Sequence, residues 1–123
     1  SQGGTVALHA AMAWGRPLGA LLCARTCFMD NVTSVSLDPA VQSTPIFVFA
    51  AGSDDIYILP LVRRCFGLLE SAGYCVTWHV EHGLAHHDNS RNEMRFAAKW
   101  ISTACLGLAR SLRRRRTREG TGV

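Results

Sequence analysis

The sequence predicts an α/β fold in which helices flank a sheet of three parallel strands. Short apolar runs of strand length alternate with longer helical segments, and the runs are continuously apolar instead of alternating. Strands of that composition are buried on both faces, as in parallel sheets covered by helices. With 123 residues, 48% of them hydrophobic and 18% charged, the chain has the length and composition of one small globular domain.

The elements are expected in the order helix, strand, loop, strand, helix, strand, loop, helix. Helical patterns cover residues 1–15, residues 59–72 up to Gly73, and residues 89–112. Strand-like runs cover residues 18–26, 46–51 and 75–80, and residues 28–44 have the composition of a connection. We therefore expect a three-layer sandwich with the sheet in the middle.

Positive charge is concentrated near the C-terminus. Residues 110–123 carry six arginines and one glutamate, whereas the remainder carries seven basic and eight acidic residues. This divides the chain into a body, residues 1–109, and a basic tail, residues 110–123, that we expect to be disordered. Nucleic-acid-binding domains more often spread their cations over a folded face, so no nucleic-acid partner is expected. The tail is either a solvated, frayed helix end or a peripheral contact with an anionic membrane surface.

The sequence predicts an intracellular protein without a membrane-spanning helix. Its apolar runs are shorter than 18 residues, and no basic-then-apolar signal segment opens the chain. The five cysteines form no CxxC pair, and three of them lie inside apolar runs, where buried thiols are common. A reducing compartment, the cytoplasm, is the localisation that this pattern favours.

Polar side chains follow the predicted strands at the points where function collects in parallel α/β sheets. Ser1 opens the segment Ser-Gln-Gly-Gly before the first helix, Asp54 and Asp55 follow the second strand, and His86 and His87 follow the third. The order along the chain is therefore serine, aspartate, histidine, the order used by α/β-hydrolases.

These residue types suit nucleophilic catalysis. A serine hydroxyl attacks only when a base takes its proton, imidazole titrates near neutrality, and a carboxylate on the far ring nitrogen holds the correct tautomer. The amide of Gln2 at the helix N-terminus points to where an oxyanion would develop. The pattern alone leaves open Asp54 or Asp55 as the acid and His86 or His87 as the base. A metal site of His86, His87 and Asp88 is the weaker alternative, because the cluster lacks an i, i+4 histidine pair.

Three motifs give the chain a family resemblance: Ser-Gln-Gly-Gly before an apolar helix, Gly-Ser-Asp-Asp after one strand, and Gly-Leu-Ala-His after the next. Together they resemble the acyl-protein thioesterase and phospholipase/carboxylesterase family of serine α/β-hydrolases. On the family's spacing, Ser1 matches the nucleophile, Asp55 the acid and His86 the base. The resemblance runs from Ser1 to about Ile101 and corresponds to the C-terminal half of such a domain, starting at the nucleophile.

The resemblance implies a partial α/β-hydrolase fold and an enzyme that cleaves esters or thioesters through an acyl-enzyme, with no cofactor and no metal. Acylated proteins or lysophospholipids are the implied substrates; a general small-ester carboxylesterase, or a non-catalytic fragment with a basic interaction tail, are the alternatives. The Cys-Ala-Arg-Thr-Cys segment at residues 23–27 departs from the family pattern. Because the N-terminal half would supply a second oxyanion donor, we expect the 123-residue chain alone to be nearly inactive.

Overall fold

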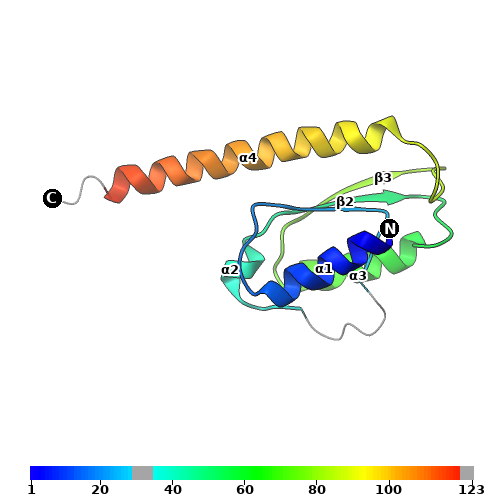
Figure 1. The fold of residues 1–123 in the computed structure, drawn as a ribbon, viewed down its shortest axis with the longest axis horizontal. Coiled ribbons are helices and arrows are strands. Elements are labelled where there is room, and N and C mark those ends of the chain that lie inside the picture. Colours follow the sequence, from blue (N-terminus) through cyan, green and yellow to red (C-terminus); the bar gives the residue numbers. More distant parts are fainter. Residues whose placement is uncertain (29–34, 120–123) are drawn as a thin grey trace.

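The computed structural model describes residues 1–28 and 35–119, and its elements follow the predicted order with one addition. They are α1 (Gln2–Trp14), β1 (Leu21–Ala24), α2 (Pro39–Gln42), β2 (Ile46–Ala51), α3 (Leu59–Ser71), β3 (Val76–Glu81) and α4 (Arg91–Glu119). The strands form one parallel sheet in the order β1-β2-β3. Figure 1 shows α1 and α3 on one face of this sheet and α4 on the other, which confirms the predicted three-layer arrangement.

The central strand β2 is buried on both faces, as its continuous apolar sequence predicts. Its alternate side chains enter two separate cores, since successive residues of a strand point to opposite faces. One core contains Ile46, Val48 and Ala50 of β2 together with residues of α1 and α3, among them Leu8, Val62, Phe66 and Leu69. The other contains Phe47, Phe49 and Ala51, packed against Ala97, Phe96 and Trp100 of α4.

The short helix α2 lies inside the segment that the sequence predicts as connection. Its start carries a recognisable signal: the Asp38 side chain accepts a hydrogen bond from the amide of Ala40, and Pro39 occupies the first helical position. Four residues give too few turns for a periodic pattern, so only the cap could have revealed this helix.

Helix α4 extends further than the sequence predicts. It continues to Glu119, so the backbone of residues 110–119 is helical where we expected a disordered tail, and residues 120–123 lie outside the described part. Arginine is among the better helix formers, which explains why a run of arginines does not end the helix. None of the described helices combines the length and the apolar character needed to cross a membrane.

Candidate active site

The three polar segments singled out in the sequence meet at the carboxyl edge of the sheet (Figure 1). The N-terminal amine of Ser1 donates to the carbonyl of Ala24, the last residue of β1, over 3.2 Å. The loop after β2 is joined to the end of β3 by a backbone hydrogen bond from Gly52 to Glu81 (2.8 Å), and to the loop after β3 by one from Ser53 to Leu84 (2.9 Å). Parallel pairing therefore brings together residues that are far apart along the chain.

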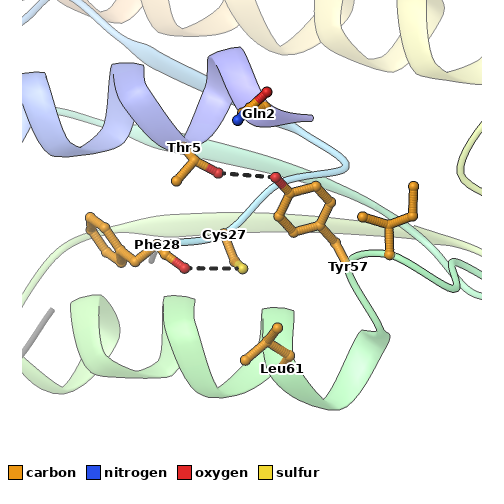
Figure 2. Close-up of a pocket in the computed structure, with 7 residues that line it drawn as sticks. Gln2, Thr5, Cys27, Phe28, Tyr57 and Leu61 are labelled. Carbon is orange, nitrogen blue, oxygen red and sulfur yellow. Dashed lines mark hydrogen bonds between the residues drawn. The ribbon is translucent and has the colours of Figure 1, made fainter. Parts of the chain in front are cut away.

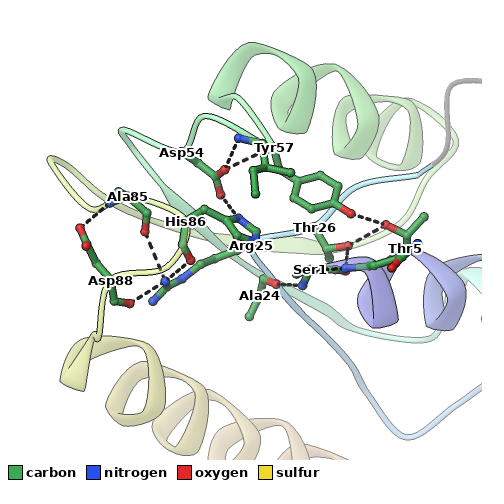
Figure 3. A network of polar contacts seen from close by, with 12 residues as sticks. Ser1, Thr5, Ala24, Arg25, Thr26, Asp54, Tyr57, Ala85, His86 and Asp88 are labelled. Atoms are coloured by element: carbon green, nitrogen blue, oxygen red, sulfur yellow. Dashed lines mark hydrogen bonds and ion pairs between the residues drawn. The ribbon is translucent and has the colours of Figure 1, made fainter.

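A buried carboxylate–imidazole pair forms the centre of this edge. Asp54 Oδ2 lies 2.8 Å from His86 Nδ1, and the two residues are only 6% and 7% exposed. The other oxygen of Asp54, Oδ1, accepts the amides of Ile56 (2.9 Å) and Tyr57 (2.8 Å), which locks the carboxylate in place (Figure 3). A carboxylate on Nδ1 leaves Nε2 as the nitrogen available for proton transfer.

Asp55 does not take the position that the family spacing gave it. Its side chain is exposed, and the carboxylate in contact with His86 belongs to the preceding residue, Asp54. The cause is local: the turn after Gly52 closes on itself through the amides bound by Asp54, which directs this side chain inward and its neighbour outward. His87 is exposed as well, and its ring meets the His86 ring edge-on at a centroid distance of 4.8 Å.

Opposing influences set the pKa of Asp54. Burial acts to raise it, whereas the hydrogen bond to His86 and the two backbone amides of Tyr57 and Ile56 act to lower it. The lowering prevails, so the pKa of this carboxyl lies below its ordinary value. Asp54 is therefore ionised at neutral pH, which is the state that stabilises a protonated imidazole.

Ser1 caps the first helix. Its Oγ accepts the amide of Gln2 over 2.6 Å, and its carbonyl accepts the amide of Gly4 over 2.9 Å. No hydrogen bond joins Ser1 Oγ to His86 among the described residues. The structure thus places Ser1 at the same edge as the Asp54–His86 pair, with the serine hydroxyl turned to its own helix.

A glycine is required where this helix meets the sheet. A Cβ on Gly4 would lie 2.8 Å from the side chain of Thr26, whereas a Cβ on Gly3 would meet nothing within 4 Å. The approach of α1 to the end of β1 therefore depends on Gly4. This close approach is what holds Ser1 against the sheet edge.

A chain of hydroxyl groups links the serine segment to the histidine. Thr26 Oγ1 donates to the Ser1 carbonyl (2.9 Å) and is hydrogen-bonded to Thr5 Oγ1 (3.1 Å), which in turn lies 3.3 Å from the Tyr57 hydroxyl. The Tyr57 ring packs beside the His86 ring at a centroid distance of 5.5 Å (Figure 3). Tyr57 therefore contacts the histidine with its ring, the aspartate with its amide and helix α1 with its hydroxyl.

A pocket opens beside Gln2, with a volume of about 360 Å³. It is lined by Gln2, Thr5, Cys27, Phe28, Ile56, Tyr57 and Leu61 (Figure 2). Most of its lining is apolar or aromatic, and its polar groups include the side chains of Gln2 and Thr5 and the hydroxyl of Tyr57. Such a site suits a small apolar group attached to a polar centre.

The sequence drew attention to Ser1, Gln2, the two aspartates and the two histidines. It singled out residues 23–27 only as a departure from the family pattern, and it gave no role to Tyr57, Thr26 or Arg25. These three residues carry no motif, and each acts through a contact more than twenty residues away or through its position in a loop. No three His, Cys, Asp or Glu side chains gather to hold a metal ion within the described ranges.

Comparison with known proteins supports the fold. No protein-family model matches the chain, and neither does any curated protein. Among solved structures, SOBER1 of Arabidopsis thaliana is 23% identical with a TM-score of 0.69, and the match covers 85% of this chain and 50% of that one. A carboxylesterase of Bacillus cereus is 20% identical with a TM-score of 0.70, covering 83% and 46%. Acyl-protein thioesterase 2 of Zea mays is 16% identical with a TM-score of 0.68, covering 85% and 53%.

These likenesses confirm the predicted partial α/β-hydrolase fold and the predicted resemblance to this group of esterases and thioesterases. The chain spans about half the length of the structures that it matches. At this level of identity the comparison shows the fold alone, and function rests on the residues of the site.

Proposed function

We propose that this chain forms the C-terminal half of a serine hydrolase that cleaves carboxylic esters or thioesters. Ser1 is the nucleophile, His86 the base and Asp54 the acid that orients it. The observation that carries the proposal is the buried 2.8 Å contact between Asp54 and His86 Nδ1, at the sheet edge where Ser1 begins a helix. A carboxylate, an imidazole and a hydroxyl in one place are the components of acyl transfer.

In this mechanism His86 Nε2 takes the proton of Ser1 Oγ as the oxygen attacks the acyl carbon. The carbonyl oxygen becomes an oxyanion, and the leaving alcohol or thiol receives the proton from His86. Water then attacks the acyl-enzyme with His86 again as base. Asp54, kept ionised by its hydrogen bonds, stabilises the imidazolium in both steps.

The amide of Gln2 supplies one donor for the oxyanion. It now donates to Ser1 Oγ at the N-terminus of α1, so rotation of the hydroxyl toward His86 would release this amide for the substrate. The same rotation would give the serine its base.

The pocket beside Gln2 supports an apolar acyl group as the part of the substrate held by this chain. Phe28, Ile56 and Leu61 offer it apolar surface within reach of the Gln2 amide. An acylated protein or a lysophospholipid fits that description, as the resemblance to acyl-protein thioesterases implies. A general carboxylesterase for small esters is the second candidate, since about 360 Å³ also holds a short acyl chain.

We assign the activity to the complete fold. The chain matches about half of its structural neighbours, and a second oxyanion donor is expected from the other half. Losing one such donor costs about 2.7–4 kcal/mol of transition-state stabilisation in a serine protease. The 123-residue chain alone should therefore turn over esters very slowly.

A fluorophosphonate probe tests the proposal on the complete protein, that is, these residues together with the rest of the hydrolase fold. We expect one labelled site, identified as Ser1 by mass spectrometry, and loss of labelling in Ser1→Ala. Ser53→Ala is the matched control, because Ser53 is an exposed serine of the neighbouring loop. Equal labelling of the wild type and Ser1→Ala would end the proposal. Rates with palmitoyl thioesters and with short acyl esters would then separate the two substrate classes.

We propose further that the C-terminal part of α4 contacts anionic membrane surfaces, and that the protein works in the cytoplasm. Helix α4 exposes Leu106 by 61%, one turn before Arg110, and residues 110–119 carry six arginines against one glutamate. Apolar side chains beside clustered cations are typical of helices that lie on a membrane, and each cation near such a surface contributes about 1 kcal/mol. We do not propose a nucleic-acid partner for these arginines.

Vesicle sedimentation tests the membrane contact. The chain should bind vesicles containing phosphatidylserine, lose binding at high salt, and fail to bind neutral phosphatidylcholine. Replacing the arginines at positions 113–116 by glutamine should abolish binding, whereas Arg63→Gln with Arg64→Gln on α3 should not. Equal binding to neutral vesicles, or retention by the glutamine variant, would contradict the proposal.

A further inference from the structure

The side chain of Arg25 is hydrogen-bonded to the loop that carries His86. Arg25 is the first residue after β1, and its side chain is only 11% exposed although it is charged. Its guanidinium NH1 donates to the carbonyls of His86 (2.6 Å), Asp88 (2.7 Å) and, at 3.3 Å, Ala85. Its Nε donates to Glu93 on α4 over 2.8 Å. Figure 3 shows the guanidinium among the carbonyls of this loop.

The segment that Arg25 binds, residues 85–88, is a tight turn. The amide of Asp88 donates to the carbonyl of Ala85, and the Asp88 side chain accepts the amide of Ala85. Three backbone carbonyls of this turn accept from one guanidinium nitrogen, NH1, while Nε serves Glu93. A lysine has a single nitrogen on a side chain one bond shorter, so it cannot reach the carbonyls and Glu93 together. Without Arg25 these carbonyls would need other donors.

The backbone of Arg25 is shaped for this contact. Its φ is 49°, and it is the one non-glycine residue with positive φ among the described residues. Its amide donates to the carbonyl of Phe49 over 2.9 Å, which extends the pairing with β2 by one residue before the chain turns. Left-handed backbone at a non-glycine residue is uncommon and is retained where the surroundings require it.

We propose that Arg25 is a positioning residue of the catalytic site: it fixes the backbone of His86 so that Nδ1 faces Asp54 and Nε2 is available to Ser1. The inference rests on the proposed function. It adds to the proposed site a residue that lies sixty-one positions before His86 and belongs to none of the three motifs. The departure of residues 23–27 from the family pattern thus acquires a role.

The rival explanation is structural, with Arg25 serving only to attach α4 through its ion pair with Glu93. The two roles use different atoms of the guanidinium. Glu93→Gln removes the charge partner and leaves the carbonyl contacts of NH1. Arg25→Lys keeps a charge near Glu93, but its nitrogen lies one bond short of the NH1 position that contacts the carbonyls. These two variants therefore separate positioning from attachment.

The test uses the complete protein and two readouts: the proton resonance of the His86 Nδ1–H bound to Asp54, and kcat with KM for an ester substrate. Arg25→Ala and Arg25→Lys should broaden or shift the resonance and lower kcat by about 100-fold, with KM unchanged, since small misplacements of a reacting group cost that much. Glu93→Gln should keep the resonance and retain kcat within about threefold. Arg63→Ala, an exposed arginine over the Trp78 ring, is the control for loss of an arginine.

An added guanidinium ion, kept well below denaturing concentrations, should restore part of the kcat of Arg25→Ala and leave Arg25→Lys unchanged. The positioning role is overturned if both Arg25 variants keep resonance and kcat, or if Glu93→Gln loses as much as Arg25→Ala. If Arg25→Ala does not fold, the comparison of the two single variants Arg25→Lys and Glu93→Gln decides between positioning and attachment. Asp54→Asn marks failure of the proposed function: if it leaves resonance and kcat unchanged, the triad is wrong whatever Arg25 does.

Discussion

A carboxylate oxygen of Asp54 lies 2.8 Å from Nδ1 of His86, inside the protein and shielded from solvent. The second oxygen of the carboxylate is held by two amides of its own loop. An ion in such surroundings is expensive unless it is hydrogen-bonded on every side, and here it is. The pair therefore has the geometry of a catalytic base, His86, oriented by a carboxylate, Asp54, and it is as well buried as the core of the protein.

The packing of α1 on the sheet edge gives a first prediction. Gly4→Ala places a methyl group 2.8 Å from Thr26, so helix or strand must shift, and we expect a loss of about 1–3 kcal/mol in the free energy of unfolding. Gly3→Ala, one position earlier with nothing within 4 Å, should be neutral or slightly stabilising. Urea denaturation of both variants measures the difference; a Gly4→Ala protein as stable as Gly3→Ala would refute the close approach.

Two adjacent leucines of α3 test the core. Leu69 is 0% exposed and Leu68 is 50% exposed. Leu69→Ala should cost about 2–5 kcal/mol, because it removes buried methyl groups and leaves a cavity. Leu68→Ala should change stability by about 0.5 kcal/mol or less. Comparable losses in thermal or urea unfolding would mean that α3 packs on the sheet in a different rotation.

The lowered pKa of Asp54 predicts how stability depends on pH. Between the folded pKa and the unfolded value of about 3.9, the unfolded chain binds the extra proton, so stability rises with pH there. The contribution of this carboxylate is complete above pH 4 or so and is lost as the pH falls toward the folded pKa.

Acid titration of the unfolding free energy measures this dependence. Asp54→Asn should be less stable than the wild type at neutral pH and lose less on acidification below about pH 4. Asp55→Asn, which alters an exposed carboxylate, should keep the wild-type slope. A wild-type slope in Asp54→Asn would show that this carboxyl has an ordinary pKa in the folded protein.

The pocket predicts acyl-chain selectivity in the complete protein. Leu61→Trp fills space beside Gln2, so kcat/KM for an octanoyl ester should fall by about tenfold or more while that for an acetyl ester changes little. Ile58→Trp is the control, since Ile58 is 49% exposed and does not line the pocket. Parallel losses on both esters would place the acyl chain elsewhere.

Most of the fold was predictable because it depends on local patterns. The continuous apolar run at residues 46–51 predicted a strand buried on both faces, and β2 has these bounds. The end of α4 was not predictable in the same way, since the charge of an arginine run suggests solvation while its helix propensity favours continuation.

For the candidate site, the sequence predicted that an aspartate of residues 54–55 lies beside His86, but not which one. Strand ends placed an acid and an imidazole at one edge, but a choice between Asp54 and Asp55 depends on the dihedral angles of a turn that neither residue determines alone. Arg25 and Tyr57 could not be found, because their roles arise from contacts with the loops after β2 and β3 that only the folded chain brings within reach. Sequence patterns locate chemistry at strand ends; they do not show what holds it there.

Matched substitution of the two neighbouring aspartates tests the central claim most directly. In the complete protein, Asp54→Asn should lower kcat for ester hydrolysis by about 10⁴-fold, as expected when a carboxylate no longer holds the tautomer of its histidine. Asp55→Asn should leave kcat within about twofold, because its side chain is exposed and the carboxylate bound to His86 is that of Asp54. The reverse result, with activity lost in Asp55→Asn and kept in Asp54→Asn, would contradict the assignment.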